Sequence, residues 1–310
     1  MARSGILLVD KSEGFTSHDV VSRTRKLLDT RKIGHAGTLD PMATGLLVLG
    51  ANSSTRLLTY LVGLDKVYET VIRLGVATVT DDREGETTAV AAPGRVDAIT
   101  REQLLTEVAR LTGDILQSPS AVSAIKVDGR RAYDRVRAGE TVELKRRPVT
   151  VHAFELGEAA LSTLPDGTRV LDIPATVHCS TGTYIRALAR DLGEALGVGG
   201  HLIALRRTRV GPFSVADART VASLSGEGAS VTDSILPPAR VAATLFPELA
   251  LSAEQAVDLG HGKKLSVPGV ADAPLAAAIG PGDALIGLVR VRNETARVVV
   301  NFPTSHGGSE

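Results

Sequence analysis

The chain has 310 residues, with 35 basic and 35 acidic side chains and 43% hydrophobic residues. This balance excludes a largely disordered protein, and the length predicts one large domain with or without a small second one. A single cysteine, Cys179, excludes an intrachain disulfide framework and a four-cysteine zinc site, and fits the reducing cytoplasm, where we expect this protein. The apolar run Ile6 to Val9 is too short for a signal peptide or a membrane span, so we expect no membrane association.

Apolar periodicity predicts a mixture of strands and helices. Strands are predicted over 6–9, 46–49, 67–74, 150–155 and 169–178, and helices over 18–28, 99–111 and 184–196. Residues 31–42 are expected to form a loop with glycine and proline, and the acidic stretch 80–94 a mobile loop. In the helix over 184–196 the apolar residues share one stripe, which places Arg186 and Arg190 on the polar face.

The C-terminal part of the chain predicts a small second domain. Residues 226–245 are polar, contain Pro237-Pro238 and are interpreted as a linker. Beyond them a short helix over 253–259 is predicted, followed by a hairpin of 284–292 with 296–301. The predicted organisation is therefore a large domain over 1–225, the linker over 226–245 and a small β-rich domain over 246–310.

Basic side chains are clustered although the net charge is zero. Eight basic residues stand between Lys126 and Arg147, and a second group comprises Arg186, Arg190, Arg206, Arg207 and Arg209. Such clusters are typical of proteins that neutralise nucleic-acid phosphates. Solvated helix faces and charged strand edges have the same composition, so charge alone leaves both interpretations open.

The stretch from Gly34 to Gly45 is the most informative in the sequence. Gly37 and Pro41 restrict it to an irregular loop, and Pro41 biases Asp40 toward an extended conformation. A carboxylate held in one place suits covalent or proton-transfer catalysis. By spacing alone the commoner interpretation is that Asp40 opens an ordinary turn before Pro41.

Other catalytic motifs are missing from the sequence. It has no nucleophile elbow, no phosphate-binding Walker loop, and no second carboxylate at a recognisable acid/base spacing from Asp40. The seven histidines include no helical i, i+4 pair, and His178 beside Cys179 is interpreted as a strand end. We therefore expect no metal site.

The loop is one of several blocks that together resemble a known family. The blocks are residues 10–11, 14–17, 34–47, 65–68, 123–127, 129–133, 137–140, 179–186 and 205–208. In this order they are similar to the TruB-type tRNA pseudouridine synthases over residues 5–213, and the C-terminal domain is weakly similar to the RNA-binding domain of bacterial members. The chain departs from the family in having Thr181 where Lys is usual and Val122 where Tyr is usual, which puts local RNA contacts in doubt.

The resemblance implies an α+β fold with a central mixed, mainly antiparallel sheet flanked by helices, plus a small β-rich C-terminal domain of the PUA type. It implies isomerisation of uridine 55 in the T arm of tRNA to pseudouridine by base flipping. No cofactor and no guide RNA are expected, and a monomer is the simplest state. A tRNA-binding or folding protein without catalytic activity is the alternative.

The resemblance also implies roles for individual residues. Asp40 would be the nucleophile or an equivalent carboxylate, with Arg186 holding it ionised and Tyr68 stacking on the flipped base. The substrate-binding residues would be His35, Tyr184, Leu205, Lys11, Arg130 and Arg131. Without the resemblance, the core is the commoner interpretation for Tyr68 and Leu205, and Arg186 and His35 also fit the surface.

Overall fold

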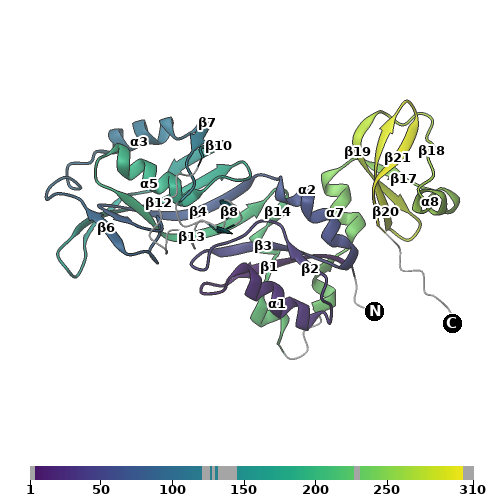
Figure 1. Ribbon diagram of the computed structural model, residues 1–310, viewed down its shortest axis with the longest axis horizontal. Helices are drawn as coiled ribbons and strands as arrows, with labels where there is room; N and C mark the ends of the chain where they lie inside the picture. Colours follow the sequence, from purple (N-terminus) through teal and green to yellow (C-terminus); the bar gives the residue numbers. More distant parts are fainter. Residues whose placement is uncertain (1–3, 121–125, 128–129, 132–144, 227–230, 303–310) are drawn as a thin grey trace.

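The computed structural model describes residues 4–120, 126–127, 130–131, 145–226 and 231–302, and only the backbone of 126–127 and 130–131. Figure 1 shows a long part built on one large sheet and a small β-rich part at the C-terminal end. Val122 and the rest of 121–125 lie outside the described residues. In the part of the chain that is described, no helix has the length and apolar character needed to cross a membrane.

The large part is organised around a twelve-stranded sheet. Along its main path the strands are β15 (Arg219–Thr220), β1 (Gly5–Lys11), β3 (Thr44–Ala51), β13 (Gly200–Val210), β4 (Lys66–Leu74), β12 (Arg169–Cys179), β10 (Arg147–Leu156) and β7 (Gly113–Gln117). Only β15 with β1 and β3 with β13 are parallel neighbours on this path. The predicted mixed, mainly antiparallel sheet is therefore confirmed.

Shorter strands extend or flank this sheet. β2 (Ile33–His35), β11 (Ala160–Thr163), β14 (Phe213–Ser214) and β16 (Ile235–Leu236) pair with β3, β12, β13 and β1, respectively. Two-stranded pairs are formed by β5 (Val76–Thr78) with β6 (Thr87–Val90) and by β8 (Lys126–Val127) with β9 (Arg130–Arg131).

Helices cover the sheet where the sequence predicts them. α1 (Ser17–Leu27) and α3 (Arg101–Arg110) each begin with a capping box, and α5 (Ile185–Ala195) packs beside α3 on one face. In Figure 1 α3 and α5 lie above the left part of the sheet and α1 below β1 and β3. Short helices also occur: α2 (Leu58–Val62), α6 (Val221–Leu224) and the 3₁₀ helices η1 (Asn52–Leu57), η2 (Val215–Asp217) and η3 (Val231–Ser234).

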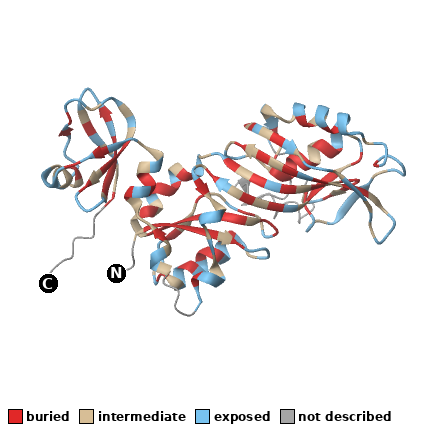
Figure 2. Cartoon of the chain, turned by 180° about the vertical axis from the view of Figure 1, so that it is seen from behind, coloured by how far each residue is buried: buried red, intermediate tan, exposed pale blue. Residues whose placement is uncertain are grey.

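Strands β1 and β3 are buried on both faces. Leu7 and Val9 pack into the main hydrophobic core with α1, whereas Ile6 and Leu8 pack into a second core on the opposite face. Figure 2 shows these central strands as nearly continuous buried ribbon. Burial on both faces explains why the sequence of β1 is a continuous apolar run rather than an alternating one.

The segment predicted as a linker over 226–245 is largely folded, which corrects that expectation. Within its described residues, β16 pairs with β1, and Pro238–Leu245 forms helix α7. Pro238 occupies the first helical turn, where a missing N–H costs nothing, so the proline pair starts a helix instead of marking an open linker. The apolar face of α7 joins the second core together with Leu285 and Leu288 of the small domain.

The small domain has the predicted helix and hairpin. Its five-stranded sheet has the order β17 (Glu248–Ala250), β19 (Ala273–Gly280), β20 (Ala284–Arg292), β21 (Thr295–Asn301) and β18 (Leu265–Ser266). Helix α8 (Ala253–Gly260) packs against β19 and β20. Asn293 and Glu294 both have positive φ, as a tight hairpin between β20 and β21 requires.

Candidate active site

The loop that carries Asp40 is held at the centre of the large sheet. It leads into β3, whose first residues pair with β13 in parallel, Arg206 opposite Thr44 and Arg207 opposite Gly45. Gly45 has φ +99°, and a Cβ there would lie 2.3 Å from the Arg207 carbonyl oxygen. Only glycine permits this approach of the two strands, so the loop geometry depends on that residue type.

Arg207 holds the same loop through hydrogen bonds to its backbone. The clustering of basic residues in the sequence did not reveal this role. The residue is 1% exposed, and its guanidinium donates to the carbonyls of Leu46, Thr38 and Gly37 at 2.8, 3.4 and 3.0 Å. The sequence placed Arg207 in a basic cluster suited to phosphates. Burial and loop contacts give it a positioning function instead.

Lys11 is a second buried cation under this loop. Its ammonium donates to the carbonyls of Phe15, Pro41 and Ser12 at 2.6, 3.1 and 3.2 Å, and the residue is fully buried. Burial lowers the pKa of Lys11 to about 8. Its charge faces the loop backbone next to Asp40 rather than solvent, which places Lys11 to hold this loop.

Asp40 and Asp82 share the guanidinium of Arg186. Arg186 Nε lies 3.0 Å from Asp40 Oδ2, and its Nη1 lies 3.2 Å from Asp82 Oδ2 and 2.7 Å from the Thr80 carbonyl oxygen. The side chains of Arg186 and Asp82 are 7% and 4% exposed, whereas that of Asp40 is 36% exposed. The buried pair thus orients a carboxylate that a ligand can still reach.

Two features differ from what the local pattern indicated. Arg186, which the apolar stripe placed on the polar face of its helix, is buried. The stretch 80–94, predicted as a loop, contains β6 and the buried Asp81 and Asp82. Asp81 accepts from Arg190 Nη1 at 3.0 Å, and burial raises the pKa of Asp81. Asp81 and Asp82 are therefore each paired with an arginine of α5.

Tyr68 lies on the same side of β4 as Thr70, Ile72 and Leu74, which are all buried as the alternation predicts. Burial raises the pKa of the Tyr68 phenol, and the nearby Arg207 opposes that shift. The phenol therefore stays protonated in the neutral range and is able to donate a hydrogen bond.

One cavity of about 270 Å³ brings five of the predicted site residues together. They are Asp40, Tyr68, Tyr184, Arg186 and Leu205, and Arg207 also contributes to the lining. Tyr184 is positioned by Gln117, which accepts from its N–H at 2.7 Å and donates to its carbonyl at 2.9 Å. Strands, a loop and the start of α5 thus place a carboxylate, two guanidinium groups and two tyrosines around one space.

A larger hollow of about 660 Å³ lies beside this cavity and shares Leu205. Three glutamates and two arginines contribute to its lining: Glu13, Glu69, Glu155, Arg83 and Arg206. An excess of carboxylates repels a phosphate-bearing ligand. The smaller cavity is therefore the better candidate for the chemistry.

The remaining predicted residues are placed differently. His35 ends β2 half-buried, with its ring edge-on to His18 at 6.1 Å, and is not among the described residues of the cavity lining. Thr181 donates to the Val62 carbonyl at 2.7 Å and lines the cavity. Arg130 and Arg131 form β9, and their side chains lie outside the described part.

Comparison with known proteins gives consistent family matches along the chain. The model of the TruB family pseudouridylate synthase N-terminal domain matches residues 25–185. Models of the tRNA pseudouridylate synthase B C-terminal domain and of the tRNA pseudouridine synthase II C-terminal domain match 186–240 and 246–303.

Curated relatives and solved structures agree with these matches. The tRNA pseudouridine synthase B of Leifsonia xyli is 54% identical over 306 residues, covering 98% of both chains, and that of Paenarthrobacter aurescens is 50% identical, covering 96% and 95%. A chain of an H/ACA RNP bound to a substrate RNA containing 2'-deoxyuridine has the same fold, with a TM-score of 0.69 at 23% identity over 97% of this chain and 85% of that one. A chain of a Cbf5-Nop10-Gar1 complex has a TM-score of 0.68 at 25% identity, covering 97% and 84%. This chain belongs to the TruB family of pseudouridylate synthases.

Proposed function

We propose that this protein isomerises uridine 55 in the T arm of tRNA to pseudouridine, acting on the bare RNA without a cofactor or a guide RNA. The observation that carries the proposal is the cavity in which Asp40, Arg186 and Tyr68 meet. The names of the curated relatives, which are tRNA pseudouridine synthases B, support tRNA as the substrate class.

The reaction balances without any redox partner or net hydrolysis. The bond between N1 of uracil and C1′ of ribose breaks, the base turns, and C5 bonds to C1′. The proton on C5 is lost, and N1 gains one, so product and substrate are isomers. The chain must therefore supply a charged group at the reacting ring, a place for the base to turn, and protection from water.

Asp40 is the charged group in this proposal. Its carboxylate is partly open to the cavity, and the Arg186 guanidinium at 3.0 Å stabilises the ionised form and fixes its direction. Arg186 is in turn held by Asp82, so it does not have to reorganise when the substrate enters.

Tyr68 and the other lining residues hold the flipped base. The Tyr68 ring offers a stacking surface, and its phenol remains a hydrogen-bond donor because burial raises its pKa. Tyr184 and Leu205 form further walls of the cavity. Flipping a base costs a few kcal/mol, which contacts with the RNA backbone must offset. We assign such contacts to the basic segment with Arg130 and Arg131. We further propose that the His35 side chain fills the space in the RNA that the extruded base leaves.

Incubation with an unmodified tRNA transcript tests this function. The wild type is expected to form pseudouridine at position 55, detected by mass spectrometry of nuclease fragments, and to form none in a transcript with cytidine there. Asp40→Asn is expected to bind the transcript and form no product.

If neither protein forms product although both bind the transcript, the chain is a tRNA-binding or folding protein without this activity. Product at another uridine would keep the isomerase but overturn the assignment of position 55. Activity that requires an added RNA would contradict action on bare tRNA.

A further inference from the structure

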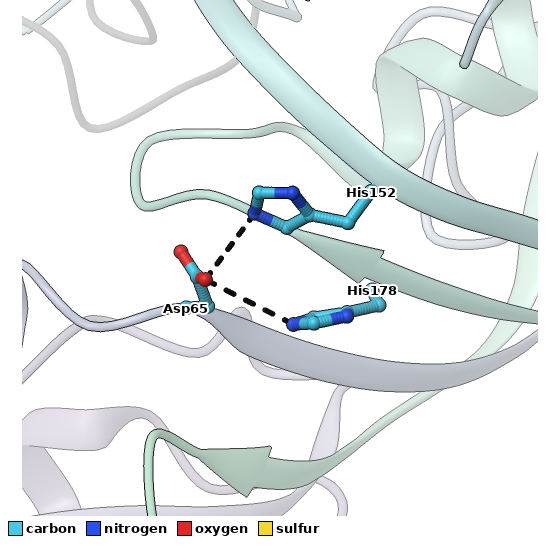
Figure 3. Close-up of side chains that lie close together, drawn as sticks. All are labelled: Asp65, His152 and His178. Atoms are coloured by element: carbon cyan, nitrogen blue, oxygen red, sulfur yellow. Dashed lines mark ion pairs between the residues drawn. The ribbon is translucent and has the colours of Figure 1, made fainter. Parts of the chain in front are cut away.

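Three donor groups converge on the sheet away from the cavity. Asp65 Oδ2 lies 3.2 Å from His152 Nε2 and 3.9 Å from His178 Nε2. Figure 3 shows both imidazoles turned toward this carboxylate. One donor atom from each side chain lies within 4.8 Å of the others. The cluster belongs to no part of the proposed isomerisation.

The sheet register explains why residues far apart in sequence meet here. His178 of β12 pairs with Val67, two residues after Asp65. The pairing of β10 with β12 shifts between Val151 and Ala153, a bulge that turns the side chain of His152 to the same face as His178. The Asp65 carbonyl accepts from Gly211 N–H at 2.8 Å, which fixes the start of β4.

We propose that Asp65, His152 and His178 bind one divalent transition-metal ion of the Zn²⁺ type. Two imidazoles and a carboxylate are a common donor set for such ions. Donor atoms on a tetrahedral zinc with bonds of about 2.0–2.1 Å are about 3.3 Å apart. The Asp65–His152 separation already has that value, and the Asp65–His178 separation exceeds it by 0.6 Å. All donor atoms lie within 4.8 Å of one another, so binding an ion requires the two imidazoles to turn toward each other.

The exposure of the cluster determines what kind of site it is. The three side chains are 48%, 36% and 34% exposed, so the remaining coordination positions are open to water. For an open site with three protein ligands we expect a Kd in the micromolar range, weaker than that of a closed structural zinc site with four protein ligands. Mg²⁺ and Ca²⁺ prefer oxygen donors and are disfavoured by the two imidazoles.

The site is separated from the catalytic cavity by the sheet itself. Lys66 and Cys179, each adjacent in sequence to a ligand, are buried on the other face, where Tyr68 also lies. A metal ion here links the start of β4 to β10 and β12 on the face of the sheet opposite Tyr68. We infer that it stabilises the fold and leaves the rate of isomerisation unchanged.

Calorimetric titration of the tag-free, metal-stripped protein with Zn²⁺ tests the site. One ion per chain is expected, and saturating Zn²⁺ is expected to raise Tm by about 5 °C. His152→Gln and His178→Gln should each weaken binding at least about tenfold and abolish the rise in Tm. Co²⁺ should give visible absorption bands in the wild type that both variants lack.

The exposed His261 in the small domain provides a matched control, and His261→Gln is expected to bind Zn²⁺ like the wild type. Unchanged Tm values without metal will show that the cluster variants are folded. Absence of saturable binding at 1 mM Zn²⁺, or equal binding by the cluster variants and the control, overturns the site. A change in isomerisation rate on Zn²⁺ binding overturns its purely stabilising role.

Discussion

At the residue scale, Arg186 connects two carboxylates in different surroundings. Asp82 is buried and accepts from the Glu84 N–H at 3.0 Å and from the Thr80 hydroxyl, whereas Asp40 faces the cavity. The buried carboxylate therefore fixes the arginine, and the arginine fixes the reactive carboxylate. Because Asp82 acts on Asp40 only through Arg186, we expect Asp82 to affect the chemical step without contacting the RNA.

Asp82→Asn keeps the size of the side chain and removes the charge that holds Arg186. We expect the single-turnover rate to fall about 100-fold, because loss of orientation by an ångström has effects of that size. The Kd for tRNA should stay within about threefold of the wild-type value, as measured by filter binding. Asp172→Asn, which removes the partner of Arg73 on the sheet, is the control and should leave the rate unchanged. If Asp82→Asn weakens tRNA binding as much as it lowers the rate, a positioning role of Asp82 is contradicted.

The burial of Lys11 is expected to make the unfolding free energy increase with pH in the mildly alkaline range. Because its pKa is lowered to about 8 in the folded protein and is near 10.4 in an unfolded chain, the unfolded state binds more protons between these values. The unfolding free energy of the wild type relative to Lys11→Met should therefore rise by about 1–2 kcal/mol from pH 7.5 to 9.5. Urea denaturation at both pH values measures this. If the difference in unfolding free energy between wild type and Lys11→Met is the same at pH 7.5 and pH 9.5, the lysine is not buried as a cation.

At the scale of elements, strands and long helices could be predicted because their cause is local. The alternation in β4 fixes which of its faces is buried, and the observed burial follows it. In α5 the predicted apolar stripe is buried as well, but so is Arg186, which the stripe placed on the polar face. The ion pairs of 80–94 could not be predicted, because the partners of Asp81 and Asp82 come from α5, about a hundred residues later. The same holds for Arg207, whose partners are the carbonyls of Gly37 and Thr38 in the Asp40 loop and of Leu46 in β3.

The close approach of β3 and β13 predicts a large cost for a side chain at Gly45. Gly45→Ala combines a positive φ with a clash against the Arg207 backbone, and we expect a loss of about 3 kcal/mol or more in unfolding free energy. Gly14→Ala is the matched control, because Gly14 also has positive φ but has no heavy atom within 4 Å of an added Cβ. It should cost about 1 kcal/mol. Equal midpoints of urea denaturation for the two variants would contradict the packing argument.

At the scale of the whole molecule, the small domain is anchored by the second core rather than tethered by a flexible linker. Residues of β1, β3, α7 and β20 all contribute to that core. The linker interpretation failed because it rested on local polarity and the Pro237-Pro238 pair, whereas the packing of α7 depends on the distant strands. The fold and the presence of two domains could be inferred from the sequence motifs. The packing of the small domain against the large one through α7 could not.

The basic segment predicts how the whole protein binds RNA. Replacing Arg130 and Arg131 with Ala should weaken tRNA binding and lower the slope of log K against log salt by about 1–2, one counterion per lost phosphate contact. Arg110→Ala removes an exposed arginine of α3 that pairs with Glu107 and should leave the slope unchanged. An unchanged slope in the double variant would show that this segment does not contact phosphates.

The central claim is that the Asp40 carboxylate, held by Arg186, carries out the isomerisation. Single-turnover release of tritium from tRNA labelled at C5 of uridine measures this most directly, because the C5 proton leaves only when the new bond to C1′ forms. We predict release of one tritium per tRNA by the wild type and none above background by Asp40→Asn, with equal tRNA binding by both. Tritium release by Asp40→Asn at the wild-type rate would contradict the account.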